Sequence, residues 1–470
     1  MSIKTTILAD FLQDFTVTKA DKMQYGEIYS PFSLIRNMFG LFAPQVFTNK
    51  ATKWLDTGAG TGYFSMVLFD LLNIGLASTI VDPAERHSHI IENMLYLIEL
   101  KPSNVAILRD RFGPQANIIN ADFLSYQPDL KFDYIIGNPP YNAHGCKKVP
   151  TNKISQKKAD GRTVWMLFLK QALRLLTPHT GQLCYIVPSL WMKPDKAGLY
   201  NLLTQYKLEK IHCLSNTETN KLFKGEAQTP TCYFLLSNIQ SAHTQSAHTQ
   251  SAYTHIYDKH CQTYVKYAYT PGTPLPLFGQ NIVKKLQPYL LKAGGPLKVI
   301  KTNMPSKHAV LSNTYDALHF PYANITTCLL QGLQPTLVVN YSSTPQAYHN
   351  QPKLILAHKM YGFPYFDITG IYGITNRDNY VLLLKDGDKT LADLTKIQAF
   401  LSTKFALYIY EATRYRMKYL EKYAFELLPD ITKLADFPVV INDKTIAVYF
   451  GLSAEDEYHI LNHSKTYGTL

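Results

Sequence analysis

Residues 54–64 read WLDTGAGTGYF, and this stretch decides the fold of the first half of the chain. Its apolar beginning predicts a buried strand that ends at Asp56. The glycines that follow, Gly58, Gly60 and Gly62, let the backbone turn sharply and pass close to a ligand before a helix starts. A helix that starts there directs its free N–H groups toward the same ligand. The stretch therefore predicts a nucleotide-type pocket at the edge of a sheet.

Two features of the same stretch narrow the choice of ligand. The glycine spacing departs from the dinucleotide fingerprint G-x-G-x-x-G, and no Lys-Ser/Thr pair of a phosphate-binding loop follows it. The carboxylate of Asp56 at the strand tip would also repel a pyrophosphate group. A ligand with an amino group and no phosphates fits better, which points to S-adenosylmethionine as the cofactor.

The residues downstream alternate between strand and helix patterns. Residues 95–99 predict a strand, residues 103–112 a helix and residues 116–123 a further strand. This βαβ order is typical of a parallel sheet that is covered by helices on both faces. The predicted fold class is therefore α/β, with a Rossmann-like parallel sheet.

Acidic residues at the ends of these strands are candidates for holding a nucleoside. Glu99 would accept hydrogen bonds from both ribose hydroxyls, as the acid of the second strand does in nucleoside pockets. Asp82 is the rival for this role. The 23 residues from Glu99 to Asp122 suit one strand–helix–strand step better than the 40 residues from Asp82 do. Asp122 and Phe123 would bind the adenine amine and the face of the adenine ring.

The second decisive motif is Asn138-Pro139-Pro140-Tyr141, which follows the apolar residues 134–137. The two prolines fix φ and lack N–H donors, so the turn keeps its backbone carbonyls available as acceptors. The side-chain oxygen of Asn138 and the carbonyl of Pro139 can accept both protons of one exocyclic NH2 group, beside the flat ring of Tyr141. The four residues are candidate catalytic residues, although the same dipeptides also mark ordinary turns.

Together these motifs resemble the amino-methyltransferases that modify adenine N6 in DNA, as found in restriction-modification systems. Their order matches the gamma arrangement, in which the cofactor motifs precede the catalytic motif and a target-recognition region comes last. The resemblance covers roughly residues 20–240. Within it, residues 22–31 look like the family's N-terminal cofactor segment, which implies cofactor-binding roles for Tyr25, Ser30 and Pro31. The family more often has Thr where Ser30 stands, and both residues carry a hydroxyl.

The resemblance implies a fold and an activity. The fold is a Rossmann-like methyltransferase sheet. The activity is methyl transfer from S-adenosylmethionine to adenine N6 at specific sites in duplex DNA, after the base has been flipped out. Residues 221–225 and 231–236 look like the family's penultimate hairpin, in which an aromatic ring packs on the flipped base. Phe223 is the candidate for that ring, and a buried core Phe is the equal alternative.

Other functions use the same motif. Methyltransferases that act on RNA bases or on protein glutamine share Asn-Pro-Pro-Tyr, but they have less need for a long C-terminal region. Cytosine N4 methylation commonly uses Ser in place of Asn138. A DNA-binding module with an inactive methyltransferase fold is the alternative that is not an enzyme. It is disfavoured because every cofactor and catalytic residue type is present.

Composition agrees with a two-domain enzyme that binds a polyanion. The 470 residues are enough for two hydrophobic cores, and 46% hydrophobic content describes a globular protein. The formal charge of +12 favours nucleic acid as a partner. The six cysteines form no C-x-x-C pair, so no metal site is expected. Because we find no signal pattern and no apolar run of membrane length, we expect a soluble, intracellular, cytoplasmic protein.

Polar segments suggest where duplex DNA binds and where the chain divides. Residues 144–162 form a basic loop beside the catalytic turn, and Lys147 and Lys148 are candidates for holding DNA phosphate. Residues 240–254 repeat Gln-Ser-Ala-His/Tyr-Thr and predict a surface hairpin tip or a linker. We therefore expect a catalytic domain at residues 1–255 and a target-recognition domain at residues 256–470. A separate restriction endonuclease would be a further partner.

The C-terminal half predicts a mixed domain. Residues 337–341 and 353–358 predict strands, and residues 391–425 predict a helical run. Tyr415, Tyr419 and Tyr423 recur at helical spacing, which is more often a packed helix face than a base-stacking ladder.

Overall fold

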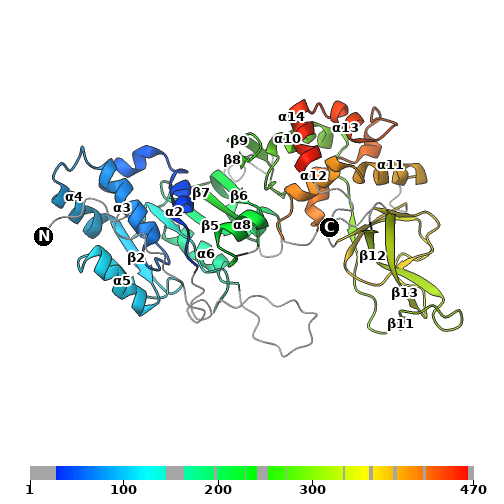
Figure 1. The fold of residues 1–470 in the computed structure, drawn as a ribbon, viewed down its shortest axis with the longest axis horizontal. Helices are drawn as coiled ribbons and strands as arrows, with labels where there is room; N and C mark the ends of the chain where they lie inside the picture. Colours follow the sequence, from blue (N-terminus) through cyan, green and yellow to red (C-terminus); the bar gives the residue numbers. More distant parts are fainter. Residues whose placement is uncertain are drawn as a thin grey trace. The chain divides into compact units, whose positions relative to one another are not determined.

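The computed structural model describes residues 28–143, 163–194, 198–227, 229–240, 252–270, 272–331, 334–358, 364–384, 389–416 and 420–463 (Figure 1). The chain divides into two compact units. The first contains residues 1–257 and 266–271, and the second contains residues 258–265 and 272–470. This division reflects packing alone, so the functional roles expected for residues 1–255 and 256–470 stay predictions.

A large sheet forms the centre of the first unit, with the strand order β3-β2-β1-β4-β5-β7-β6-β8-β9. The five strands from β3 to β5 are parallel, and β7 lies antiparallel between β5 and β6. The strands are β1 (Trp54–Asp56), β2 (Leu95–Glu99), β3 (Asn117–Asn120), β4 (Tyr134–Gly137), β5 (Gln182–Pro188), β6 (Tyr206–Leu214), β7 (Thr231–Gln240), β8 (Ala252–Asp258) and β9 (Thr263–Tyr269).

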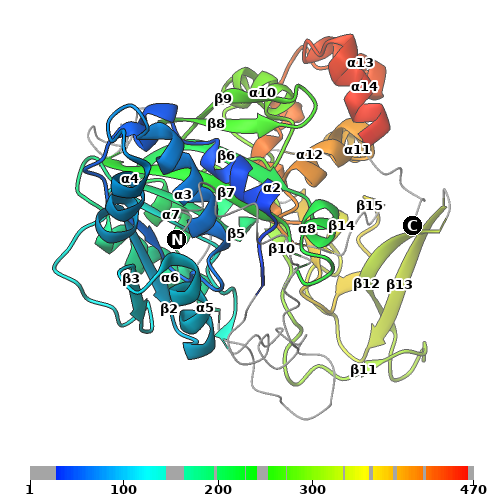
Figure 2. The same ribbon diagram turned by 60° about the vertical axis from the view of Figure 1, so that its left-hand side comes forward.

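Helices cover both faces of this sheet (Figures 1 and 2). They are α2 (Phe32–Phe39), η2 (Pro44–Thr48), α3 (Tyr63–Gly75), α4 (Pro83–His89), η3 (Ile90–Met94), α5 (Pro102–Phe112), α6 (Trp165–Leu175), η5 (Ser189–Met192), α7 (Leu199–Leu203) and α8 (Asn216–Leu222). The predicted fold class, an α/β Rossmann-like methyltransferase sheet, is confirmed.

The strand order changes direction between β1 and β4. From β1 the chain moves to β2 and β3 on one side of β1, whereas β4 and β5 lie on the other side. Because parallel crossovers are right-handed, this reversal places α3 and α5 on one face and α6 on the opposite face. The carboxyl ends of β1 and β4 therefore leave a crevice between them, which is where open α/β sheets bind ligands.

Two glycines hold the tight turn after β1. Gly60 has φ +55° and Gly62 has φ +96°, a region that side chains with a Cβ rarely adopt. A Cβ on Gly62 would also lie 2.9 Å from the side chain of Leu108 in α5. The N–H of Ala59 donates to the carbonyl of Ile98 in β2 at 2.9 Å, which ties the turn to the neighbouring strand.

Several expected elements need correction. The strand expected at residues 116–123 is only β3, because the chain turns at Asp122, whose carboxylate accepts the N–H of Leu124. The hairpin expected at residues 221–236 is wrong. Its first part is the end of α8, which begins with a capping box at Ser215, and Phe223 follows that helix directly.

The second unit combines two small sheets with helices. One sheet has the order β10-β17-β14-β15 and the other β11-β13-β12-β16. The strands are β10 (Ile300–Lys301), β11 (Leu311–Ser312), β12 (Tyr322–Gln331), β13 (Gln334–Ser342), β14 (Lys353–Ala357), β15 (Tyr365–Asp367), β16 (Gly373–Ile374) and β17 (Asn379–Leu383). The helices are α10 (Gln280–Lys292), α11 (Leu391–Leu401), α12 (Lys404–Ala412), η6 (Lys422–Leu427), η7 (Ile431–Lys433), α13 (Asp443–Tyr449) and α14 (Ala454–His463).

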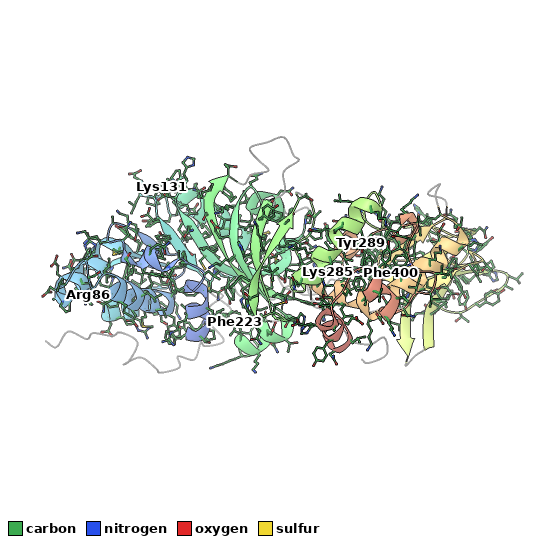
Figure 3. All side chains as sticks on the ribbon, turned by 90° about the horizontal axis from the view of Figure 1, so that it is seen from above. Arg86, Lys131, Phe223, Lys285, Tyr289 and Phe400 are labelled. Carbon is green, nitrogen blue, oxygen red and sulfur yellow. The ribbon has the colours of Figure 1, made fainter. Side chains whose placement is uncertain are left out.

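The helical part of the second unit is joined by polar contacts to α10. Tyr289 donates its hydroxyl to the carbonyl of Tyr449 at 2.6 Å, and Lys285 donates to the carbonyl of Gly451 at 3.0 Å (Figure 3). Within the described residues, no helix has the length and apolar character needed to cross a membrane.

The helical run expected at residues 391–425 is broken. α12 ends at Ala412, so Tyr415 lies beyond the helix and Tyr423 lies in the separate η6. Tyr415 is fully buried, and its hydroxyl donates to the carbonyl of Leu275 at 2.6 Å. Tyr419 lies outside the described residues. The tyrosine spacing therefore does not describe one helix face.

Candidate active site

A cleft opens at the reversal point of the first unit's sheet. Its empty volume is about 1070 Å³, counted up to its open mouth. Five segments and one side chain contribute most of its wall: residues 28–30, 57–60, 98–100, 121–123 and 138–141, and Phe223. Of the candidate site residues among those described, Pro31, Asp56 and the rival ribose candidate Asp82 do not line this cleft, and the others do.

The glycine turn presents bare backbone to the cleft. A Cβ built on Gly58 would meet nothing within 4 Å, so the surrounding protein does not fill the space beside it. The N–H of Gly60 donates to Glu99 Oε2 at 2.7 Å. This bond fixes the glycine turn against the end of β2.

Glu99 and Asp82 have different surroundings. Glu99 is 8% exposed, lines the cleft and accepts a second backbone bond from Lys101 N at 2.8 Å through Oε1. Asp82 is exposed and caps α4, because its Oδ1 accepts the N–H groups of Ala84 and Glu85 at 2.8 Å. Of the two acids, Glu99 lines the cleft and Asp82 does not.

Asp56 lies behind the glycine turn. It is 3% exposed, and its Oδ2 accepts the hydroxyl of Ser65 at 2.9 Å. The pKa of Asp56 is raised to about 7, chiefly by burial and to a smaller extent by the negative charge of Glu99, against the opposing effect of the hydrogen bonds from Ser65 and the Gly58 backbone. Asp56 does not line the cleft, so the direct cofactor contact expected for it has no support in this geometry.

The Asn138-Pro139-Pro140-Tyr141 turn lines the cleft. Nδ2 of Asn138 donates to the hydroxyl oxygen of Ser30 at 3.1 Å. No N–H or O–H group of the described residues donates to Asn138 Oδ1 or to the carbonyl of Pro139. The turn is tied to the start of α6, because Val164 N donates to the carbonyl of Tyr141 at 3.1 Å.

Aromatic rings line the cleft on two sides. Phe123 packs against Phe168 of α6 with ring centroids 5.2 Å apart, beside Asp122. Phe223, only 4% exposed, lines the cleft together with Tyr141. Burial raises the pKa of Tyr141, so its phenol stays protonated at neutral pH. Tyr141 can therefore offer a ring face but not a base.

Sequence reasoning missed several residues of the wall. Tyr29 stacks on Tyr63 with centroids 5.2 Å apart, and both line the cleft. Phe168 and the buried Asn104 also contribute. Tyr29 is the neighbour of Ser30 in the segment that resembles a cofactor motif, so this segment could have indicated that Tyr29 lines the cleft. Phe168 and Asn104 lie inside ordinary helical patterns, which carry no such signal.

Tyr25, Lys147 and Lys148 lie outside the described residues, as do residues 241–251 of the polar repeat. Among the residues that the structure describes, no group of three or more His, Cys, Asp or Glu side chains has the geometry to hold a metal ion.

The bare backbone and the acceptor groups of the cleft fit S-adenosylmethionine. The bare backbone at Gly58 accepts close approach, the Glu99 carboxylate matches a ribose diol, and Asp122 with Phe123 match an adenine amine and ring.

Part of the chain matches known methyltransferases. Residues 79–223 match the family model of the Eco57I restriction-modification methylase. The chain is 32% identical over 97 residues to the type II methyltransferase M.TthHB8I of Thermus thermophilus, which is 18% of this chain and 22% of that protein. The predicted resemblance to methyltransferases of restriction-modification systems is confirmed at this level.

The chain is also similar to a tRNA methyltransferase and, more weakly, to a solved structure. The chain is 28% identical over 145 residues to a tRNA1(Val) (adenine(37)-N6)-methyltransferase of Aliivibrio fischeri, covering 30% of this chain and 53% of that protein. The chain therefore spans about a fifth of the length of the Thermus thermophilus relative and about half of the length of the Aliivibrio fischeri relative. A modification subunit of a putative type I restriction enzyme from Vibrio vulnificus aligns with a TM-score of 0.36 and 17% identity, covering 51% of this chain and 49% of that one. A likeness of this size carries no argument about activity.

Proposed function

We propose that this protein is an S-adenosylmethionine-dependent methyltransferase that methylates adenine N6 at specific sites in duplex DNA. The observation that carries the proposal is the pair of acceptors at Asn138 Oδ1 and the Pro139 carbonyl, which receive no hydrogen bond from the described residues and line the same cleft as the glycine turn. Because an exocyclic NH2 group has two protons to donate, this pair of acceptors suits an aromatic amine.

The cofactor residues form the other half of the cleft. Gly58 and Gly60 would let the methionine part approach the backbone, Glu99 would accept the ribose hydroxyls, and Phe123 would face the adenine ring. The cofactor supplies an electrophilic methyl group on a sulfonium, which becomes a neutral thioether after transfer.

Positioning and electrostatics account for the proposed chemistry. The lone pair of adenine N6 is delocalised into the ring, so the nitrogen is a weak nucleophile until it becomes pyramidal. Acceptors at Asn138 and Pro139 would hold the two N–H groups in that geometry and stabilise the positive charge that develops. After transfer, N6 would release one proton to water. No general base is needed.

A base in a duplex is stacked and paired, so it must be flipped into the cleft at a cost of a few kcal/mol. Stacking on Tyr141 and Phe223 would return roughly 1–3 kcal/mol per ring. We assign this step to residues 1–255 and target recognition to residues 256–470. The charge of +12 supports a nucleic acid partner, with a separate restriction endonuclease as a further possible partner.

RNA adenine is the second candidate substrate. The relative from Aliivibrio fischeri is named as a tRNA adenine-N6 methyltransferase, and the proposed grip on an exocyclic amine does not depend on the sugar. Parallel reactions with duplex DNA and with tRNA, followed by mass spectrometry of the nucleosides, separate the two substrates.

The test of the proposed function is Asn138→Ala. We expect wild-type protein to form N6-methyladenine in duplex DNA and the variant to lose about 100-fold or more in methyl transfer, because a lost transition-state contact costs this much. Cofactor affinity measured by calorimetry should stay unchanged. Asn93→Ala, at an exposed asparagine of η3, is the matched control and should react normally. Near-normal turnover of Asn138→Ala would remove this residue from the catalytic role.

A further inference from the structure

Residues 28–30 form a strap that touches both halves of the cleft. The ring of Tyr29 stacks on Tyr63 and lies over the glycine turn, since a Cβ on Gly60 would be 3.6 Å from Tyr29 Cε1. The next residue, Ser30, is 4% exposed and accepts the hydrogen bond from Asn138 Nδ2. The strap thus joins the cofactor turn to the catalytic turn, which lies 108 residues further along the chain.

The amide of Asn138 has to face in one direction for the proposed chemistry. An asparagine side chain carries an acceptor on one side and a two-proton donor on the other. If the amide were turned over, its NH2 group would face the NH2 group of the base, and two donors would meet. In the structure Nδ2 donates to an acceptor on the cleft wall, and this orientation leaves Oδ1 without a donor from the described residues.

Ser30 is the group that can supply this acceptor. Its oxygen lies 3.1 Å from Asn138 Nδ2, and no other acceptor of the described residues bonds to that nitrogen. The segment is held in place independently of Asn138 by the stacked rings of Tyr29 and Tyr63, and Pro31 begins α2 by accepting the N–H of Ile35 at 3.1 Å. A fixed acceptor costs no reorganisation during the reaction.

We infer that Ser30 is a positioning residue that holds the Asn138 amide with Oδ1 toward the substrate amine. This inference rests on the proposed function and changes the role of Ser30, which the family resemblance assigns to cofactor binding. A positioning role predicts slow methyl transfer without Ser30, whereas a cofactor-binding role predicts weak cofactor affinity. The two roles are therefore separated by measurement.

The experiment compares Ser30→Ala with Ser30→Thr in the full-length protein. We expect kcat for adenine methylation to fall about tenfold or more in Ser30→Ala, with the Kd for S-adenosylmethionine within about twofold of wild type. Ser30→Thr keeps the hydroxyl and should recover most of kcat. Ser33→Ala, at an exposed serine of α2, is the matched control. Thermal unfolding of each variant shows that it is folded.

A double-mutant cycle separates positioning from general disturbance. Ser30 acts through Asn138, so Ser30→Ala should cause no further loss in the Asn138→Ala background. An equal loss in both backgrounds overturns the inference, as does a normal kcat in Ser30→Ala, a weakened cofactor Kd, or a Ser30→Thr variant as slow as Ser30→Ala. Failure of the proposed function looks different, because wild-type protein itself would then methylate no nucleobase amine in DNA or tRNA.

Discussion

Glu99 and Asp82 allow the assignment of the cofactor pocket to be tested by two substitutions with opposite expected effects. From the sequence alone, either acid is a candidate acceptor for the ribose hydroxyls. In the structure, Glu99 accepts the N–H groups of Gly60 and Lys101 at 2.7 and 2.8 Å at the edge of the cleft. The carboxylate of Asp82 instead caps the first turn of α4.

The expected magnitudes follow from these contacts. Glu99→Gln keeps the shape of the side chain but loses the charge and one acceptor oxygen. A hydrogen bond to a charged group contributes about 1.5–3 kcal/mol, so cofactor affinity should fall about 10- to 150-fold. Asp82→Ala loses a helix cap worth about 1 kcal/mol, which lowers Tm by about 2–4 °C for a unit of this size.

Isothermal titration calorimetry with S-adenosylmethionine and thermal unfolding of the same protein samples measure both effects. We expect Glu99→Gln to change the Kd strongly, and Asp82→Ala to change the Tm while leaving the Kd within about twofold. If Asp82→Ala weakens cofactor binding and Glu99→Gln does not, the ribose role belongs to Asp82 and the reasoning from the cleft is wrong.

Two further predictions concern Asp56 and Phe223. Burial raises the pKa of Asp56 from 3.8 to about 7, so the folded state binds more protons than the unfolded state between these values and loses stability as pH rises through that window, by up to about 1.4 kcal/mol per pH unit. Urea unfolding between pH 5 and pH 7 should show a weaker pH dependence in Asp56→Asn, and an identical slope would contradict the burial argument. Phe223→Ala should lower kcat/KM for duplex DNA about 5- to 150-fold, because stacking on a flipped base is worth roughly 1–3 kcal/mol, with the cofactor Kd unchanged. Steady-state kinetics measure this, and an unaltered kcat/KM would make Phe223 a core residue only.

Local patterns predicted the parallel part of the sheet well. The apolar runs expected at residues 95–99 and 134–137 coincide with β2 and β4, because each is bounded by glycine or a charged residue. The single helical run expected at residues 391–425 was wrong. Its composition favours helix, yet α12 ends at Ala412 and Tyr415 beyond it is fully buried. Tertiary context routinely overrides local helix propensity.

The sequence by itself determined the glycine turn, the Asn-Pro-Pro-Tyr turn and the order of the strands between them, because short-range periodicity and turn residues are properties of neighbouring positions. Only the tertiary structure decided which side chains meet. In the folded chain Asp56 is buried and Asp82 caps a helix. The hydroxyl oxygen of Ser30 lies 3.1 Å from Asn138 Nδ2. Contacts between distant residues depend on how strands pair and helices pack, and that information is not contained in any local stretch of the chain.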